Sequence, residues 1–118
     1  MKNAYQIIRQ GDVILVPVRS LPSGLTPIPL DKGRIVLAYG EVTGHAHAIA
    51  DHTSAKRETN KIIAKLFGAS NGQRFLEVTA PVNLTHEEHT PHLIPPGLYE
   101  VPIQVDMTSD KLPRRVAD

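Results

Sequence analysis

Cysteine is absent from the 118 residues of this chain. Without a thiol, the chain has no disulfide scaffold, no thiolate zinc finger, no iron–sulfur cluster and no cysteine nucleophile. Any metal ion that it binds must therefore be held by histidine and carboxylate side chains.

An excess of charge of one sign is also missing, since 13 Lys and Arg face 12 Asp and Glu, for a net charge of +1. The two signs are interleaved, so bulk charge does not attract nucleic acid. The longest apolar run, Val13–Val18, contains Pro17 and is far shorter than the about 20 residues of a membrane helix. We expect no membrane span. The first ten residues lack the apolar core of a signal peptide, so we expect a cytoplasmic protein.

The length and the balance of residue types predict one compact domain over 1–118. Hydrophobic residues make up 41% of the chain and charged residues 21%, which is typical of a globular domain with its own core. The segment 108–118 has little apolar content, and we predict that it is a mobile tail.

What the chain does have is 10 prolines and 8 glycines, scattered at short intervals. They leave few stretches long enough for a helix, so the sequence predicts an all-β chain. We expect strands at 12–18, 33–40, 42–50, 61–69, 73–79, 81–86 and 98–107. Seven or eight short strands are typical of a sandwich, a jelly roll or a barrel, and we predict a single small barrel or jelly-roll-like domain.

The segment 53–67 is ambiguous, because its apolar residues fit an amphipathic helix as well as a strand. The following Asn71-Gly72 pair is typical of a type I′ turn, and it favours a β-hairpin made of 61–69 and 73–79. One helical turn near 54–60 remains compatible with the sequence.

All six histidines fall in two short windows, with His45, His47 and His52 in the first and His86, His89 and His92 in the second. Alternation along 42–50 places His45 and His47 on one strand face, about 6 to 7 Å apart at a rise of about 3.3 Å per residue. Small residues lie on the opposite face. Two imidazoles on one face begin a metal site, and a second window is needed to complete it.

The second window supplies the remaining ligands in our interpretation. Alternation along 81–86 turns His86 toward the apolar, inward face of its strand, and His89 follows closely. Glu87 and Glu88 lie between these two histidines, where they are candidate carboxylate ligands, hydrogen-bond partners of the ligands or a general base.

We therefore predict a site for a divalent transition metal such as zinc, iron, manganese or nickel, all of which accept neutral imidazole. Its predicted ligands are His45, His47, His86 and His89. We expect His52 and His92 to be ordinary hydrogen-bonded histidines. The HEEH string is not the H-E-x-x-H of metalloproteases, because its second histidine comes one residue too early.

Several strings resemble those of a family of small, uncharacterised bacterial and phage-associated proteins: QGDVILVPV, LAYGEVTGHAHAI, LTHEEHTPHLIPPGLYEV and RRVAD. A looser likeness is to the cupins, metal-binding β-barrels in which a glycine precedes an H-x-H pair, much as Gly40 precedes His45 and His47. No glutamate follows His47 at the cupin spacing. The likeness to cupins implies a barrel and a bound metal.

Together these features predict a metal-binding protein that acts as a metal-dependent hydrolase, lyase or oxygenase on a small or anionic substrate. The metal would polarise the substrate or activate a water molecule, and Glu87 or Glu88 would move protons. One alternative is a non-catalytic interaction module of phage or mobile-element origin. Another is a metal-independent phosphodiesterase in which two histidines act as acid and base. The sequence is compatible with a homo-oligomer as well as with a monomer.

Overall fold

The computed structural model of the chain describes residues 6–40, 45–54, 61–87, 89–102, 105–106 and 114–115. In this part of the chain every regular element is a β-strand, which confirms the predicted all-β class. None of these residues belongs to a helix that could cross a membrane. The helical turn considered near 54–60 falls almost entirely outside the described residues.

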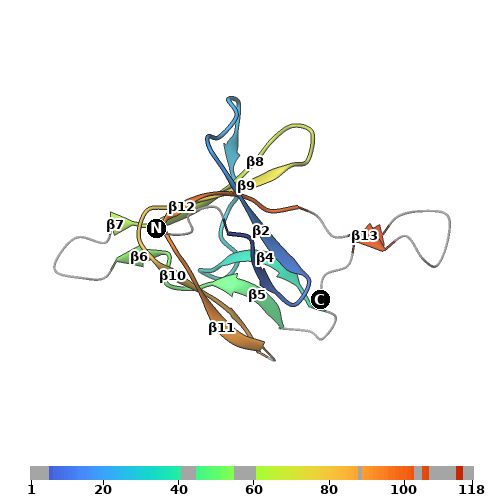
Figure 1. Ribbon diagram of the computed structural model, residues 1–118, viewed down its shortest axis with the longest axis vertical. Coiled ribbons are helices and arrows are strands. Elements are labelled where there is room, and N and C mark those ends of the chain that lie inside the picture. Colours follow the sequence, from blue (N-terminus) through green and yellow to red (C-terminus); the bar gives the residue numbers. More distant parts are fainter. Residues whose placement is uncertain are drawn as a thin grey trace.

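Two antiparallel sheets make up most of the structure (Figure 1). The larger has six strands in the order β1 (Ile8–Gln10), β2 (Val13–Val18), β12 (Gly97–Glu100), β9 (Arg74–Val78), β8 (Ala64–Gly68) and β3 (Thr26–Pro27). The smaller has four strands in the order β11 (His89–Ile94), β10 (Val82–His86), β5 (Ala46–Ile49) and β4 (Ile35–Tyr39). Two further pairs are β6 (Thr53–Ser54) with β7 (Lys61–Ile62) and β13 (Val105–Asp106) with β14 (Arg114–Arg115).

The two sheets are open, and the prediction of a single closed barrel is wrong. Strands β1 and β3 end the larger sheet, β11 and β4 end the smaller one, and no described hydrogen-bonded pairing joins the sheets. Alternation specifies which face of a strand is buried, but it does not specify whether the outermost strands pair with each other. A jelly-roll-like arrangement stays a prediction.

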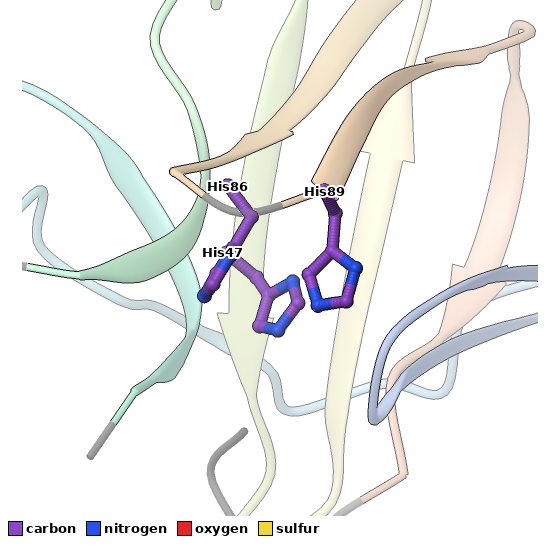
Figure 2. Close-up of side chains that lie close together, drawn as sticks. All are labelled: His47, His86 and His89. Carbon is purple, nitrogen blue, oxygen red and sulfur yellow. The ribbon is translucent and has the colours of Figure 1, made fainter. Parts of the chain in front are cut away.

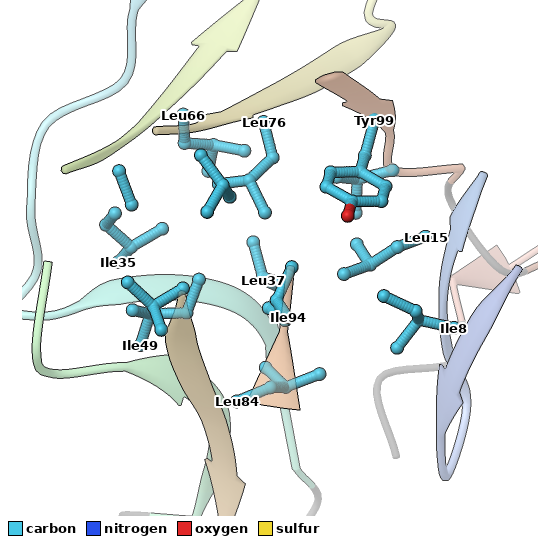
Figure 3. Packing of buried hydrophobic residues seen from close by; sticks show 14 of the residues in the cluster. Ile8, Leu15, Ile35, Leu37, Ile49, Leu66, Leu76, Leu84, Ile94 and Tyr99 are labelled. Carbon is cyan, nitrogen blue, oxygen red and sulfur yellow. The ribbon is translucent and has the colours of Figure 1, made fainter. Parts of the chain in front are cut away.

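The core lies between the two sheets, and both contribute to one hydrophobic cluster (Figure 3). Leu15 and Leu76 come from the six-stranded sheet, whereas Leu84 and Ile94 come from the four-stranded sheet, and each is fully buried. Burying one such side chain contributes about 1.5 to 3 kcal/mol. This cluster holds the two sheets together and sets the position of the strands that carry the histidines.

The predicted β8–β9 hairpin is confirmed, with Leu66 paired with Leu76. Its turn differs from the prediction. Gly72 has a φ of 93°, but among the described non-glycine residues only Lys32 has a positive φ, so Asn71 does not meet the requirement of a type I′ turn. The Gly72 N–H donates to the Ala69 carbonyl over 3.0 Å, as in a three-residue loop with glycine in the left-handed region.

Strands β1 and β11 were not expected. Strand β11 contains Pro91, which cannot donate a ladder hydrogen bond, and most of its residues are exposed. It lies at the edge of its sheet, and its register with β10 shifts between Leu84 and His86. Edges and bulges are the places where a sheet tolerates proline. The strand predicted over 98–107 is also interrupted, because β12 ends at Glu100, before Pro102.

The segment predicted as a mobile tail, 108–118, lies mostly outside the described residues. Its described part is β14, which pairs with β13. Within the described residues, neither of these strands is hydrogen-bonded to the two main sheets.

Candidate metal centre

Three histidines lie in a row across three adjacent strands of the four-stranded sheet. Thr85 on β10 pairs with Ala48 on antiparallel β5, so the next pair along the ladder brings His86 opposite His47. On the other side of β10, His86 pairs directly with His89 of β11. The two histidine windows therefore meet in space through strand register.

The rings of these residues lie against one another, as Figure 2 shows. The ring centroids of His47 and His86 are 4.2 Å apart, those of His86 and His89 are 4.8 Å apart, and those of His47 and His89 are 5.6 Å apart. Each ring offers one nitrogen to a group whose atoms all lie within 4.8 Å of one another. We refer to His47, His86 and His89 as the histidine triad.

Burial differs across the histidine triad. His47 is fully buried, His86 is 7% exposed, and His89 is exposed. In a tetrahedral site with bonds of about 2.0–2.1 Å, ligand nitrogens lie about 3.4 Å apart. A metal ion would therefore draw the nitrogens closer together, and the exposed ring of His89 has the freedom to swing inward.

The HEEH string is explained by the β10–β11 hairpin. His86 and His89 are paired across the ladder, so only Glu87 and Glu88 lie between them at the turn. A cross-strand pair puts two side chains on the same face of a sheet. The cross-strand pair thus brings two histidines together on a sheet, as the four-residue spacing of H-E-x-x-H brings two histidines together on one face of a helix.

Gln10, a residue that the sequence analysis did not single out, contacts the histidine triad from the six-stranded sheet. It is 5% exposed, and its Oε1 lies 2.9 Å from His47 Nδ1. Its Nε2 donates to the carbonyl of Leu84 over 2.9 Å and to that of Thr90 over 3.0 Å. A single amide therefore joins β1 to β5, β10 and β11.

Gly11, the next residue, lets the backbone of the β1–β2 turn approach the rings. Its φ is 59°, and a Cβ there would lie 2.9 Å from His89 Nε2, 2.9 Å from His47 Cε1 and 3.3 Å from His47 Nε2. Real Cβ atoms essentially never come within 3.0 Å of such a neighbour. Only glycine therefore suits both the left-handed conformation and the space beside the two rings.

A sequence signal for this turn does exist. Gly11-Asp12 separates the paired residues Gln10 and Val13, and a glycine in the first central position is typical of a type II′ hairpin turn. This signal indicates a hairpin, but it does not indicate that the hairpin lies over histidines far along the chain.

Glu87, a predicted proton carrier, is engaged in a backbone contact. Its Oε1 accepts a hydrogen bond from the Ala46 N–H over 3.0 Å. That bond, followed by one from its own backbone N–H, lowers the pKa of the Glu87 carboxyl. A carboxylate with a lowered pKa is a weaker base, so the contact favours a role in tying the hairpin turn to the start of β5. Glu88 lies outside the described residues.

His45, a predicted ligand, is not part of the histidine triad. Its ring meets that of His86 edge to face, with centroids 5.9 Å apart. Strand β5 begins at Ala46. The His45 carbonyl accepts a hydrogen bond from the N–H of Gly40 over 3.0 Å, one position beyond the Tyr39–Ala46 pair of the β4–β5 ladder.

The two histidines that were not predicted as ligands also lie outside the histidine triad. His52 donates from Nε2 to the Gly33 carbonyl over 2.9 Å. His92 is exposed on β11 and pairs with Leu84.

Comparison with known proteins identifies a family. No curated protein and no solved structure matches the chain. The family model described as a domain of unknown function, DUF8820, matches residues 9–104, which span the histidine triad together with Gln10 and Gly11. The chain therefore belongs to the DUF8820 family.

Proposed function

We propose that the chain binds one divalent transition-metal ion through His47, His86 and His89. The observation that carries this proposal is that imidazoles from strands β5, β10 and β11 each bring one nitrogen into a group whose atoms lie within 4.8 Å of one another. Metal-binding imidazoles are commonly oriented by a hydrogen bond from their other ring nitrogen. The contact between His47 Nδ1 and Gln10 Oε1, at 2.9 Å, supplies such a bond.

The chemistry proposed for this centre is the activation of a water molecule. Three protein ligands leave the fourth position of a tetrahedral ion to water or substrate. Three neutral imidazoles also leave the ion its full positive charge, which lowers the pKa of a bound water to about 7 for zinc. The resulting hydroxide would attack a small electrophilic substrate, as in a hydrolase or a hydrating lyase.

An oxygenase is less well supported by the same ligand set. Non-haem iron oxygenases typically use two histidines and one carboxylate, whereas the described group contains three histidines. Glu87, a nearby carboxylate, is bound to the Ala46 N–H, and this favours hydrolysis or hydration over oxygen chemistry.

The experiment is a zinc titration of protein made without a histidine tag, with metal content measured by mass spectrometry. We expect one ion per chain. His47→Ala, His86→Ala and His89→Ala should each weaken binding at least about tenfold, or about 1.4 kcal/mol. The matched control is His92→Ala, which removes an exposed histidine from the same strand as His89 and should leave the affinity unchanged. Equal losses in His89→Ala and His92→Ala would indicate loose surface binding and contradict the site.

The open position is tested with cobalt(II), whose visible spectrum reports its coordination. Added azide should change the spectrum if water holds the fourth position. A site closed by four protein ligands would instead ignore azide, which would indicate a stabilising ion in a non-catalytic module.

Catalysis is tested with a small activated ester. Hydrolysis should require zinc and should be lost in His89→Ala. Turnover that persists after complete metal removal would favour metal-independent acid–base catalysis by two histidines and overturn the proposal.

A further inference from the structure

The amide of Gln10 can be oriented in only one way. Its nitrogen lies 2.9 Å from the Leu84 carbonyl oxygen and 3.0 Å from the Thr90 carbonyl oxygen. Both neighbours are acceptors, so the group that faces them must be the NH₂, which has two hydrogens to donate. The reverse orientation would bring three oxygen atoms together without a proton between them.

This orientation determines the protonation of His47. With the NH₂ group used by Leu84 and Thr90, the atom that faces His47 Nδ1, at 2.9 Å, is the acceptor Oε1. An amide oxygen cannot donate, so Nδ1 must carry the hydrogen. In a neutral imidazole the other nitrogen, Nε2, then holds the lone pair that a metal ion requires.

The position of Nε2 agrees with this assignment. The space left by the missing side chain of Gly11 is bordered by His47 Nε2 and His89 Nε2, which would lie 3.3 Å and 2.9 Å from a Cβ there. These two nitrogens therefore border the same small region beside the turn, together with His47 Cε1, which would lie 2.9 Å from that Cβ. Full burial of His47 and its place inside the sheet, between β10 and β4, prevent the ring from reorienting freely.

We propose that Gln10 is a positioning residue of the metal centre, which holds His47 in its Nδ1–H tautomer and presents Nε2 to the ion. This inference rests on the proposed function. It adds that a residue of the β1–β2 hairpin, in the six-stranded sheet, sets the tautomer of the ligand His47, which lies in the four-stranded sheet.

The experiment reads the tautomer directly. Long-range proton–nitrogen correlation spectra of the metal-free chain report which ring nitrogen carries hydrogen, and the His47→Ala spectrum assigns the His47 signals. We expect a protonated Nδ1 and a bare Nε2. In Gln10→Leu this acceptor is lost, so the share of the Nδ1–H tautomer should fall, and the zinc affinity of the folded protein should fall about 10- to 100-fold.

A second variant separates positioning from a merely structural role. Gln10→Glu keeps an acceptor for His47 Nδ1 but has no hydrogens to donate to the carbonyls of Leu84 and Thr90. It should therefore lose stability while it retains the Nδ1–H tautomer and most of the zinc affinity. If zinc affinity instead follows stability in both variants and the tautomer does not change, the role of Gln10 is structural and the inference is overturned.

Failure of this inference is distinguishable from failure of the proposed function. An Nε2–H ring in a wild-type chain that binds zinc overturns the role of Gln10 alone. A wild-type chain that binds no zinc overturns both, whichever tautomer His47 adopts. The wild-type spectrum is assigned with His47→Ala and does not need Gln10→Leu, so the test holds even if Gln10→Leu fails to fold.

Discussion

Gly11→Ala adds one methyl group beside the histidine triad and leaves every proposed ligand in place. The new Cβ would lie 2.9 Å from His47 Cε1 and 2.9 Å from His89 Nε2. Ordinary contacts of this kind are about 3.5 Å, so these atoms must separate by about 0.6 Å. His47 is fully buried whereas His89 is exposed, so we expect His89 to be pushed away and the histidine triad to open.

The matched control is Gly33→Ala. Gly33 has a φ of 79°, close to the left-handed conformation of Gly11, but a Cβ at Gly33 meets nothing within 4 Å. Both variants therefore incur a backbone cost of about 1–2 kcal/mol. Gly11→Ala should lose a further 1–3 kcal/mol or so through crowding, as overpacked sites do.

Urea unfolding of the metal-free proteins measures the stability difference, and zinc titration measures the site. We expect Gly33→Ala to bind zinc like the wild type and Gly11→Ala to bind it at least about tenfold more weakly, or about 1.4 kcal/mol. If the two variants unfold at the same urea concentration and bind zinc equally, the turn does not lie against the rings, and the reasoning is refuted.

Three further predictions concern the stability of the fold. Gly72→Val should cost about 1–2 kcal/mol in thermal or urea unfolding, because the φ of 93° at Gly72 disfavours a side chain; a variant that unfolds like the wild type would contradict the described turn. Tyr99→Phe should cost about 0.5–1.5 kcal/mol, because the Tyr99 hydroxyl donates to the Pro95 carbonyl over 2.7 Å. Burial raises the pKa of Tyr99, so its contribution to stability should be complete below about pH 10 and fall as the pH rises through the raised pKa; this alkaline loss should shrink in Tyr99→Phe. Removal of 111–118 deletes β14, which pairs only with β13 among the described strands, and should leave cooperative unfolding intact within about 0.5 kcal/mol; loss of cooperativity would show that the segment is docked.

Local features of this fold were predictable from the sequence. The alternation along 81–86 predicted that His86 faces inward, and β10 does bury Val82, Leu84 and His86 while Asn83 and Thr85 stay exposed. The hairpin of β8 and β9 followed from Asn71-Gly72. In both cases the information lies within one strand or one turn, where side-chain period and backbone conformation are decided by neighbouring residues.

The composition of the candidate site depends on longer-range pairing, and the sequence predicted only part of it. Whether His86 lies beside His47 is decided by the pairing of Thr85 with Ala48, which joins strands that no short turn connects. Alternation also placed His45 with His47, whereas in the structure the His45 ring meets that of His86 edge to face, 5.9 Å between centroids, and lies outside the histidine triad. The contact of Gln10 with His47 depends on how the two sheets pack, and no periodicity within β1 reports it.

The position of the histidine triad across β5, β10 and β11 has a consequence for local unfolding. Strand β11 is an edge strand, with exposed residues and a proline, and such strands exchange their amide hydrogens through local opening more readily than interior strands do. An ion held by His89 and by the interior residue His47 would have to lose a ligand before β11 could separate from β10. The slowing of amide exchange in β11 on addition of zinc would then report how tightly the ion binds the state in which β11 is paired with β10.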